Sequence, residues 1–309
     1  MIRGYLKLLV IFTALSITSR LFAIDKDSNC RVNIAMEKAS VSVHGVFYNG
    51  NNISSWCKND GMIVSHHYDG HAGMKWPGHT NKSIDYASGL CLMGMTIDNE
   101  IRSASCEYST EFYPGFILPD GTPADPTDQS FKIYKINADG SGDWDAWPFD
   151  QGAPVLKTKL GLDSLDAFGN RIPRLYGDQT LFWVMNDANW GKHGLYNTKP
   201  MGVEVQVLIF GYNEPPLLQD VMFVQWKIIN KSGNTYHSCY AGIFDDCDLG
   251  DAVDDYTGCS PELDLSYTYN SDIDDRQYNL VPPAVGNALL SGPVSKGTPL
   301  SMTSFISYT

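Results

Sequence analysis

The sequence predicts an all-β protein, an antiparallel β-sandwich with long loops and few or no helices beyond an N-terminal leader. Glycine and proline, which interrupt helices, account for 28 and 16 of the 309 residues. Long stretches lack the 3.6-residue spacing of apolar side chains that an amphipathic helix needs. Hydrophobic residues make up 43% of the chain, which is enough to bury a core. These observations together favour strands and turns.

The first element is an export signal peptide over residues 1–23. Arg3 and Lys7 supply positive charge, and an apolar run follows from Leu8 to Ile17. That run is too short to span a bilayer comfortably, and Ala23 is a suitable residue before a cleavage site. We therefore exclude residues 1–23 from the predicted fold. An uncleaved membrane anchor is the alternative.

The negative net charge of the chain restricts the kinds of partner that it can bind. The whole chain carries −13, and removal of Arg3, Lys7 and Arg20 with the leader would change this to −16. An acidic exported chain is poorly suited to nucleic acid or anionic membranes. We therefore expect no nucleic-acid binding and no membrane insertion after leader removal, whereas cations are suitable partners.

Residues 24–200 are predicted as a β-rich region with long loops. The clearest hairpin joins Leu90–Ile97 to Ile101–Tyr108. A two-residue turn at Asp98-Asn99 would place Cys91 opposite Cys106, close enough for a disulfide. The loops dominate from residue 120 to 178, with one short strand at 131–136.

Residues 201–309 are predicted as a β-sandwich region with an acidic loop, either separate from the first region or part of one domain with it. The segments "GVEVQVLIFGY", "DVMFVQWKIIN" and "TYHSCYAGIF" have the β-branched and aromatic alternation of paired strands. The sequence ends in the strand-like "PLSMTSFISYT". This ending suggests the front part of a longer protein, truncated at its C-terminus.

The acidic loop carries the strongest functional signal. Eleven of the 32 residues from Phe244 to Asp275 are Asp or Glu, and carboxylates this close repel unless water or a cation screens them. Calcium takes about six to eight oxygen ligands in flexible geometry, and Gly250 can turn the chain so that carboxylates converge. A solvated loop with Asx-turns is the alternative. The predicted calcium ligands are Asp246, Asp248, Asp251, Asp254 and Asp255.

Cysteines suggest further cross-links in an oxidising compartment. Seven lie beyond the leader, an odd number, so at least one is left over or pairs between chains. Cys247 and Cys259 bracket the acidic core, and a bridge between them is a second candidate. None of the cysteines has the CxxC spacing that is typical of a structural zinc site, so we do not expect one.

Other motifs support weaker alternatives. Glu107, Glu111 and Glu204 lie on predicted strands, where a glycosidase could place its two carboxyls, and tryptophans could form a sugar platform. These tryptophans are Trp144, Trp147 and Trp190. The stretch 66–71, "HHYDGH", is a possible zinc or copper site, although exposed histidines are favoured. The stretch 137–145, "NADGSGDWD", begins like an EF-hand loop but has Pro148 where a Glu should stand, which favours an ordinary turn.

Several segments together resemble one family. They are "NNISSWCKNDG", "KWPGHTNKSIDYASGL", "EIRSASCEYSTEFYPG", "FKIYKIN", "WPFDQGAP", "GDQTLFWVMNDAN", "GVEVQ", "FVQWKIINKSGNT", "DLGDAVDDYTGC" and "LVPPAVG". The chain resembles the N-terminal region of large uncharacterised secreted or surface proteins of Bacteroidetes-type bacteria. Such proteins typically end in a sorting domain for the type IX secretion system. The resemblance implies export to the cell surface, with the secretion machinery as a partner.

This chain departs from the family at three places. Relatives usually have a polar segment in place of "HHYDGH", a tryptophan in place of Cys91 and a small residue in place of Cys106. The paired change agrees with the hairpin disulfide. It also means that a bridge here would not be a property of the whole family.

We therefore expect a secreted or cell-surface, non-catalytic β module with a structural calcium site, adhesive in role. The runner-up is a carbohydrate-binding or polysaccharide-degrading module acting through the tryptophan-rich region. The expected partners are calcium, the secretion machinery, and polysaccharide or other cell-surface components.

Overall fold

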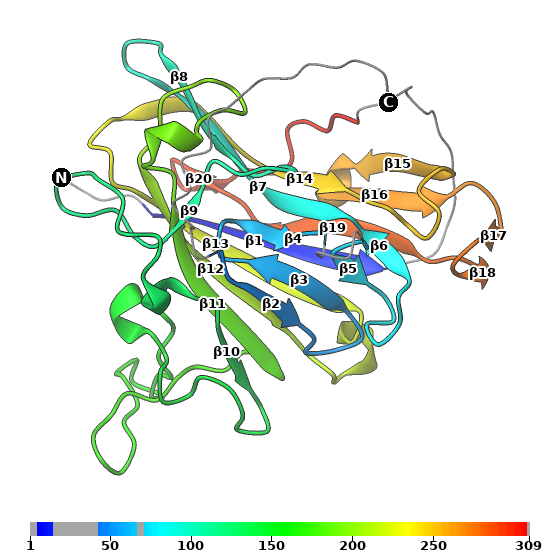
Figure 1. The fold of residues 1–309 in the computed structure, drawn as a ribbon, viewed down its shortest axis with the longest axis horizontal. Coiled ribbons are helices and arrows are strands. Elements are labelled where there is room, and N and C mark those ends of the chain that lie inside the picture. Colours follow the sequence, from blue (N-terminus) through cyan, green and yellow to red (C-terminus); the bar gives the residue numbers. More distant parts are fainter. Residues whose placement is uncertain (1–4, 15–42, 67–70, 308–309) are drawn as a thin grey trace.

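The computed structural model describes residues 5–14, 43–66 and 71–307 of the chain. It is mainly β, with several antiparallel sheets in a sandwich-like arrangement (Figure 1), which confirms the predicted fold class. The helices in the described part are short 3-10 turns at Gln129–Phe131, Phe149–Gln151, Trp190–Lys192, Pro216–Leu218 and Pro261–Leu263. None of these described helices has the length and apolar character to span a membrane.

The large sheet has nine strands. Its order is β10 (Tyr134–Asn137), β11 (Gln179–Asn186), β12 (Val203–Gly211), β13 (Val221–Asn230), β1 (Tyr5–Ala14), β19 (Ala284–Ser291), β16 (Leu265–Asn270) and β15 (Asp255–Ser260), with β9 (Tyr113–Pro114) beside β11. The path runs from strands of the first predicted region through strands of the second, so both regions contribute to one sheet.

Two four-stranded sheets accompany it. One contains β14 (Tyr236–Asp246), β7 (Ala87–Thr96), β4 (Met62–Val64) and β8 (Ile101–Ser105). The other contains β2 (Gly45–Tyr48), β3 (Ser54–Lys58), β5 (Met74–Lys75) and β6 (Ser83–Asp85). Two small ribbons are β17 (Asp274–Asp275) with β18 (Asn279–Leu280), and β20 (Val294–Ser295) with β21 (Thr298–Pro299).

Alternating side chains of the large sheet build two cores. Trp183 of β11 and Trp226 of β13 are fully buried in the first core, which they share with side chains of both smaller sheets. Phe182 and Phe210 point to the opposite face and pack with Trp147 of the long loop. Because successive strand residues face opposite sides, this alternation places the large sheet between the smaller sheets and the long loop.

The leader prediction needs correction in one respect. Tyr5–Ala14 is not outside the fold, because it forms β1 and pairs with β13 on one side and β19 on the other. Val, Ile and Phe are typical both of the hydrophobic part of a leader and of a strand in a sheet, so the sequence pattern alone fits either role. The expected cleavage position after Ala23, and Cys30, lie outside the described residues.

The structure contains the predicted hairpin, but the predicted register was wrong by one residue. Cys91 pairs with Ser105, because the loop holds three residues and Asn99 adopts a left-handed conformation (φ 61°). Such a loop adds one residue to the predicted two-residue turn. Cys106 therefore falls beyond Cys91, and both thiols are free, so the predicted disulfide is absent.

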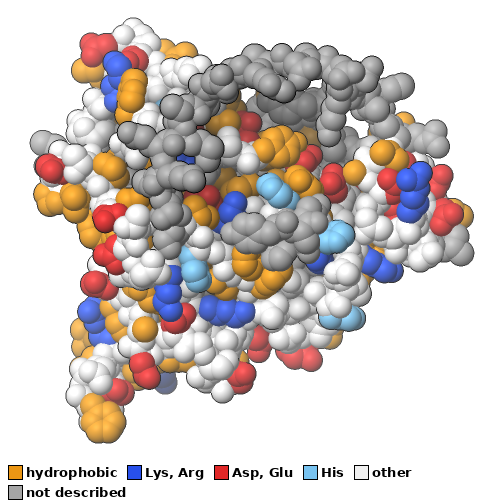
Figure 2. Space-filling view, viewed as in Figure 1, with side chains coloured by type: hydrophobic (Ala, Val, Ile, Leu, Met, Phe, Trp, Pro, Cys, Tyr) orange, Lys and Arg blue, Asp and Glu red, His pale blue; other side chains and the backbone are white. Residues whose placement is uncertain are grey.

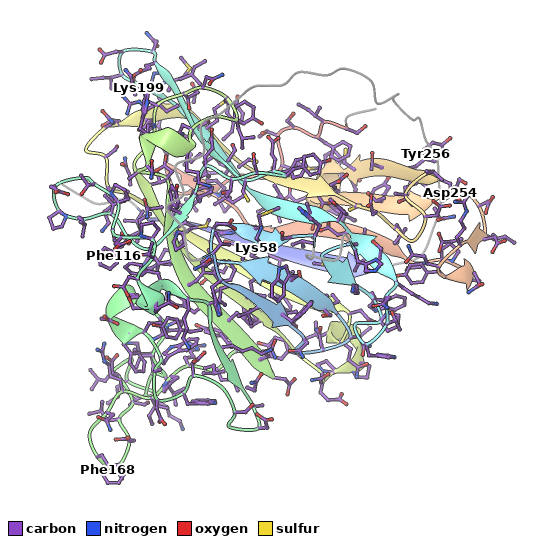
Figure 3. The ribbon with its side chains drawn as sticks, in the orientation of Figure 1. Lys58, Phe116, Phe168, Lys199, Asp254 and Tyr256 are labelled. Atoms are coloured by element: carbon purple, nitrogen blue, oxygen red, sulfur yellow. The ribbon has the colours of Figure 1, made fainter. Side chains whose placement is uncertain are left out.

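The long loop contains a ring that the sequence analysis missed. Three eight-residue units, 156–163, 164–171 and 172–179, are joined in a closed cycle of backbone hydrogen bonds. The Leu156 N–H donates to the Ile172 carbonyl, the Ile172 N–H to the Ser164 carbonyl, and the Ser164 N–H to the Leu156 carbonyl. Glycines recur at 161, 169 and 177 with positive φ. Phe168 stands at the tip of this projection, at the lower left of Figure 3.

Candidate functional site

Glu111, one of the glutamates considered for hydrolysis, serves the fold. Its side chain is fully buried, and one carboxylate oxygen accepts the Ser105 N–H at 3.1 Å. The other oxygen accepts the Leu195 N–H at 3.2 Å. A carboxylate that is held by backbone donors on both oxygens joins the end of β8 to the segment at Leu195.

The other two glutamates also have structural partners. Glu204 is buried, accepts the Ile117 N–H at 3.2 Å, and pairs with the Lys231 ammonium at 3.2 Å. Glu107 accepts a hydrogen bond from the Tyr196 hydroxyl. Each of these two glutamates is therefore held by contacts within the fold.

The tryptophans divide into two kinds. Trp147 is buried and donates its indole N–H to the Pro154 carbonyl, and Trp144 packs on the same core and donates to the Asn137 carbonyl. Trp190 differs, because 61% of it is exposed and it lines an open hollow of about 340 Å³. The three tryptophans therefore do not form a single platform.

The acidic segment turns at Gly250, as predicted. Its φ of 69° is left-handed, and a Cβ there would lie 2.3 Å from the Asp275 carboxylate. That buried carboxylate accepts the N–H groups of Asp251 at 2.7 Å, Gln277 at 2.7 Å and Tyr278 at 2.5 Å. Asp275, which the sequence analysis did not select, therefore fixes the turn, and glycine leaves room for it.

An inner pair of acids lies where β14 meets β6. The Ser88 hydroxyl contacts Asp85 at 2.8 Å and Asp245 at 2.5 Å, and the Asn287 amide donates to Asp245 at 2.6 Å. Burial, and then the neighbouring Asp245 charge, raises the pKa of Asp85 well above its usual range. Two carboxyls this close are best accommodated when they share a proton.

An outer group of acids lies at the far edge of the large sheet (Figure 3, Asp254). Asp255 is paired with Asn270 across β15 and β16, and the Asn270 amide donates to Asp254 at 3.2 Å. Asp255 accepts the Leu249 N–H at 2.8 Å through one oxygen. We call Asp254, Asp255 and Asn270 the edge triad.

Each member of the edge triad has a buried oxygen without a hydrogen-bond partner. These are Oδ1 of Asp254, Oδ1 of Asp255 and Oδ1 of Asn270. Asn270 is fully buried. A buried acceptor without a donor is costly, so a group of three acceptors favours an added donor or cation.

The pKa shifts have the same origin. Burial raises the pKa of Asp255 to about 8, and the charges of Asp254, Asp248 and Asp275 add to the shift. Burial and the charge of Asp251 also raise the pKa of Asp254. Burial, followed by the charge of Asp246, raises the pKa of Asp248 to about 6. Removing negative charge, by a proton or a cation, would therefore stabilise this edge.

The five predicted ligands are divided among different environments. Asp254 and Asp255 lie in the edge triad, whereas Asp251 pairs with the Arg276 guanidinium at 2.8 Å. The charge of Asp246 contributes to the raised pKa of Asp248, whereas burial and the charge of Asp245 raise the pKa of Asp246. Figure 2 shows acidic side chains at the right-hand end of the molecule, over β15 to β18.

Within residues 43–66 and 71–307, no three His, Cys, Asp or Glu side chains converge to hold a metal ion. A cation at the edge triad would instead combine two carboxylates with the amide oxygen of Asn270. Calcium accepts amide and backbone carbonyl oxygens as well as carboxylates, so this donor set suits it. The calcium ion itself remains a prediction.

Cys247 and Cys259, the second candidate bridge, are both free. Cys247 instead lies against the inner pair, where its thiol contacts the Asp245 carboxylate at 3.0 Å. Burial, and then the Asp245 charge, raises the pKa of this thiol well above its usual range. The raised pKa therefore favours the protonated form of the Cys247 thiol.

Two weaker motifs have local roles. In the EF-hand-like stretch, Asp139 accepts hydrogen bonds from the Ser141 N–H and hydroxyl, and Asp143 accepts the Lys135 N–H, so the stretch forms an ordinary turn. In the histidine stretch, the ring of His66 stacks on Tyr86 with 5.2 Å between centroids. The residues 67–70 of that stretch lie outside the described part.

Comparisons of this chain with models of protein families, with curated proteins and with solved structures gave no match.

Proposed function

We propose that this chain is an exported, non-catalytic β module of the cell surface or medium, in which a calcium ion stabilises the edge of the large sheet. One observation carries the calcium site: three buried acceptor oxygens of the edge triad lack donors, next to carboxyls whose pKa values are raised by burial. A divalent cation supplies what this group lacks, namely positive charge and an acceptor of oxygen lone pairs.

The export half of the proposal rests on the sequence. A basic start and an apolar run precede a small residue at Ala23, and the segments quoted above resemble surface proteins of the type IX secretion system. The secretion machinery and cell-surface components are the partners that follow from this. An adhesive role agrees with the hydrogen-bonded ring of the long loop, which exposes Leu160 and Phe168 to 86% and 91%.

The test is the melting temperature of the exported protein in calcium, in magnesium and in a chelator. Calcium at about one hundred times its dissociation constant adds roughly 2.7 kcal/mol if the unfolded chain does not bind it. For a chain of this size that corresponds to a shift of several degrees, at about 2–4 °C per kcal/mol. Magnesium should have a smaller effect, because it requires near-octahedral geometry and retains water. A melting temperature that ignores both calcium and chelator would refute the site.

The second candidate function is carbohydrate binding, and Trp190 is the observation that favours it. This exposed indole lines the open hollow together with the polar side chains of Arg102 and Asn234, and an aromatic face beside polar groups is suited to a sugar ring. Glycan-array binding by the exported protein, compared with Trp190→Ala, tests it. Equal binding by both proteins, or none by either, would remove this candidate.

A further inference from the structure

The open hollow beside Trp190 is lined by positive side chains. Its charged lining residues are Arg102, Lys199 and Lys231, and none of the described residues that line it is Asp or Glu. The chain as a whole has 35 acidic and 22 basic residues, so the hollow has the reverse of the overall composition. A local surplus of positive charge in an acidic chain favours an anionic ligand at this place.

The fold holds two of these cations side by side. Arg102 of β8 forms a parallel backbone bridge with Lys199. Both side chains pair with the same carboxylate, that of Glu100, and the contact from Arg102 measures 2.9 Å. Lys231 pairs with Glu204 at 3.2 Å. Three cations therefore share two carboxylates, which leaves one positive charge in excess.

A second hollow of about 310 Å³ adjoins the first at Lys231, which lines both. Glu204 lines the second hollow, so its ion pair with Lys231 lies where the two hollows meet. The second hollow also contains two aromatic rings and two neutral amides, from Phe116, Phe149, Gln151 and Gln206. Aromatic faces beside neutral hydrogen-bonding groups are suited to a sugar ring.

The two hollows differ in charge. The second has the carboxylates of Asp150 and Glu204 against one ammonium, whereas the charged groups of the first are all cations. A carboxylate on a ligand would therefore be attracted to the first hollow and repelled from the second. Lys199 and Phe116, one from each hollow, lie at the left of Figure 3, far from Asp254 of the edge triad at the right.

We propose that the two hollows are adjacent subsites for a glycan in which an acidic sugar is linked to a neutral one. This inference rests on the carbohydrate-binding function given above as the second candidate. The acidic sugar lies against the Trp190 indole, and its carboxylate is attracted by the cations of the first hollow. The neutral sugar occupies the second hollow, where Asp150 and Glu204 would repel a second carboxylate.

A glycan array followed by titration calorimetry tests the ligand class. The probes are oligosaccharides of hyaluronan, in which glucuronate and N-acetylglucosamine alternate, of polygalacturonate, which is acidic throughout, and of chitin, which is neutral throughout. The hyaluronan tetrasaccharide should bind at least about tenfold more tightly than its carboxyl-reduced form, because the reduced form lacks the charged contact. It should also bind more tightly than the other two tetrasaccharides and than glucuronate alone.

Substitutions at the charged groups test the first subsite without removing its aromatic face. Lys199→Gln should weaken binding of the hyaluronan tetrasaccharide about fivefold and leave binding of the carboxyl-reduced form unchanged. Lys157→Gln is the matched control, because these two lysine side chains are 51% and 47% exposed and each pairs with one carboxylate. Glu100→Gln should strengthen binding of the acidic glycan several-fold, because it frees the charges of Arg102 and Lys199.

Three results would overturn the inference while leaving carbohydrate binding in place. They are equal affinity for the tetrasaccharide and its carboxyl-reduced form, equal affinity for glucuronate alone, and an equal loss in Lys157→Gln and Lys199→Gln. Equal binding of a polyglutamate peptide would show that the hollow attracts any polyanion, which also overturns it. Absence of binding to every glycan on the array would instead refute the carbohydrate-binding function itself, and this inference with it.

Discussion

Two of the regions that contain buried carboxylate oxygens accommodate them in different ways. Beside the first strands of the large sheet, Glu111 has a backbone N–H on each carboxylate oxygen, and Glu204 has a backbone N–H and an ammonium. At the opposite edge, Asp254, Asp255 and Asn270 each have a buried oxygen with no donor. The first region is self-sufficient, whereas the second requires a proton or a cation from solution.

Glu111→Ala should produce the largest loss of stability. The substitution leaves the Ser105 and Leu195 N–H groups without their buried acceptor, at a cost of roughly 2–5 kcal/mol in the free energy of unfolding. Urea unfolding measures it. The control is Glu107→Ala, whose side chain is only partly buried and should cost less than about 1 kcal/mol. Similar losses for both variants would contradict the structural role of Glu111.

Asp255→Asn should have the next largest effect, and only when calcium is present. It removes one ligand charge, so most of the roughly 2.7 kcal/mol gained at saturating calcium should disappear. In chelator the variant should melt no lower than wild type, because Asn is neutral at a position where burial already disfavours the ionised carboxylate. Glu262→Gln, an exposed acid of the same segment, is the control and should keep the calcium response. A normal response in Asp255→Asn would exclude this residue as a ligand.

The pH dependence should distinguish the two regions further. The folded-state pKa of Asp255, about 8, and that of Asp248, about 6, lie above the value near 4 of an unfolded chain. The folded state therefore binds more protons, and this contribution to stability is complete below about pH 4 and is lost as the pH rises through about 6 to 8. Chemical unfolding in chelator at pH 6, 7 and 8 should show the decline. Asp255→Asn should flatten its upper part, and an unchanged slope would refute the assignment.

Arg276→Ala should have the smallest effect. Its side chain is 80% exposed and its ion pair with Asp251 is a surface contact, so the loss should be under about 1 kcal/mol. The variant also distinguishes the proposed site at the edge triad from the ligand set predicted by spacing. If Asp251 were a ligand, freeing it from Arg276 would tighten calcium binding several-fold. Titration calorimetry should instead give an affinity close to that of wild type.

Local sequence patterns predicted the fold class correctly. They failed for features that depend on a single backbone angle or on a residue far away in the sequence. Strand alternation is a property of neighbouring residues, and it found β12 and β13. The Cys91 register depended on Asn99, whose left-handed conformation adds a residue to the loop. The hydrophobic part of a leader and a strand of a sheet contain the same residue types, so the sequence could not distinguish them.

The site was predicted only in part for a similar reason. Asp254 and Asp255 were selected because they lie in the dense acidic run. Asn270 and Asp275 were missed, because they reach the site through the pairing of β15 with β16 and through the turn beyond it. Gly161, Gly169 and Gly177 are spaced by eight residues, and this spacing could have predicted the ring. The repeat was missed because it has only three short units.

Titration calorimetry of the exported protein with calcium, repeated at pH 7 in buffers of different ionisation enthalpy, tests the central claim most directly. Because the pKa of Asp255 is about 8, this carboxyl is mostly protonated at pH 7 and must lose its proton to become a ligand. We expect one calcium per chain with release of close to one proton at pH 7, decreasing toward none at about pH 9. Absence of binding, or binding whose heat is the same in every buffer at pH 7, would contradict a calcium site at the edge triad.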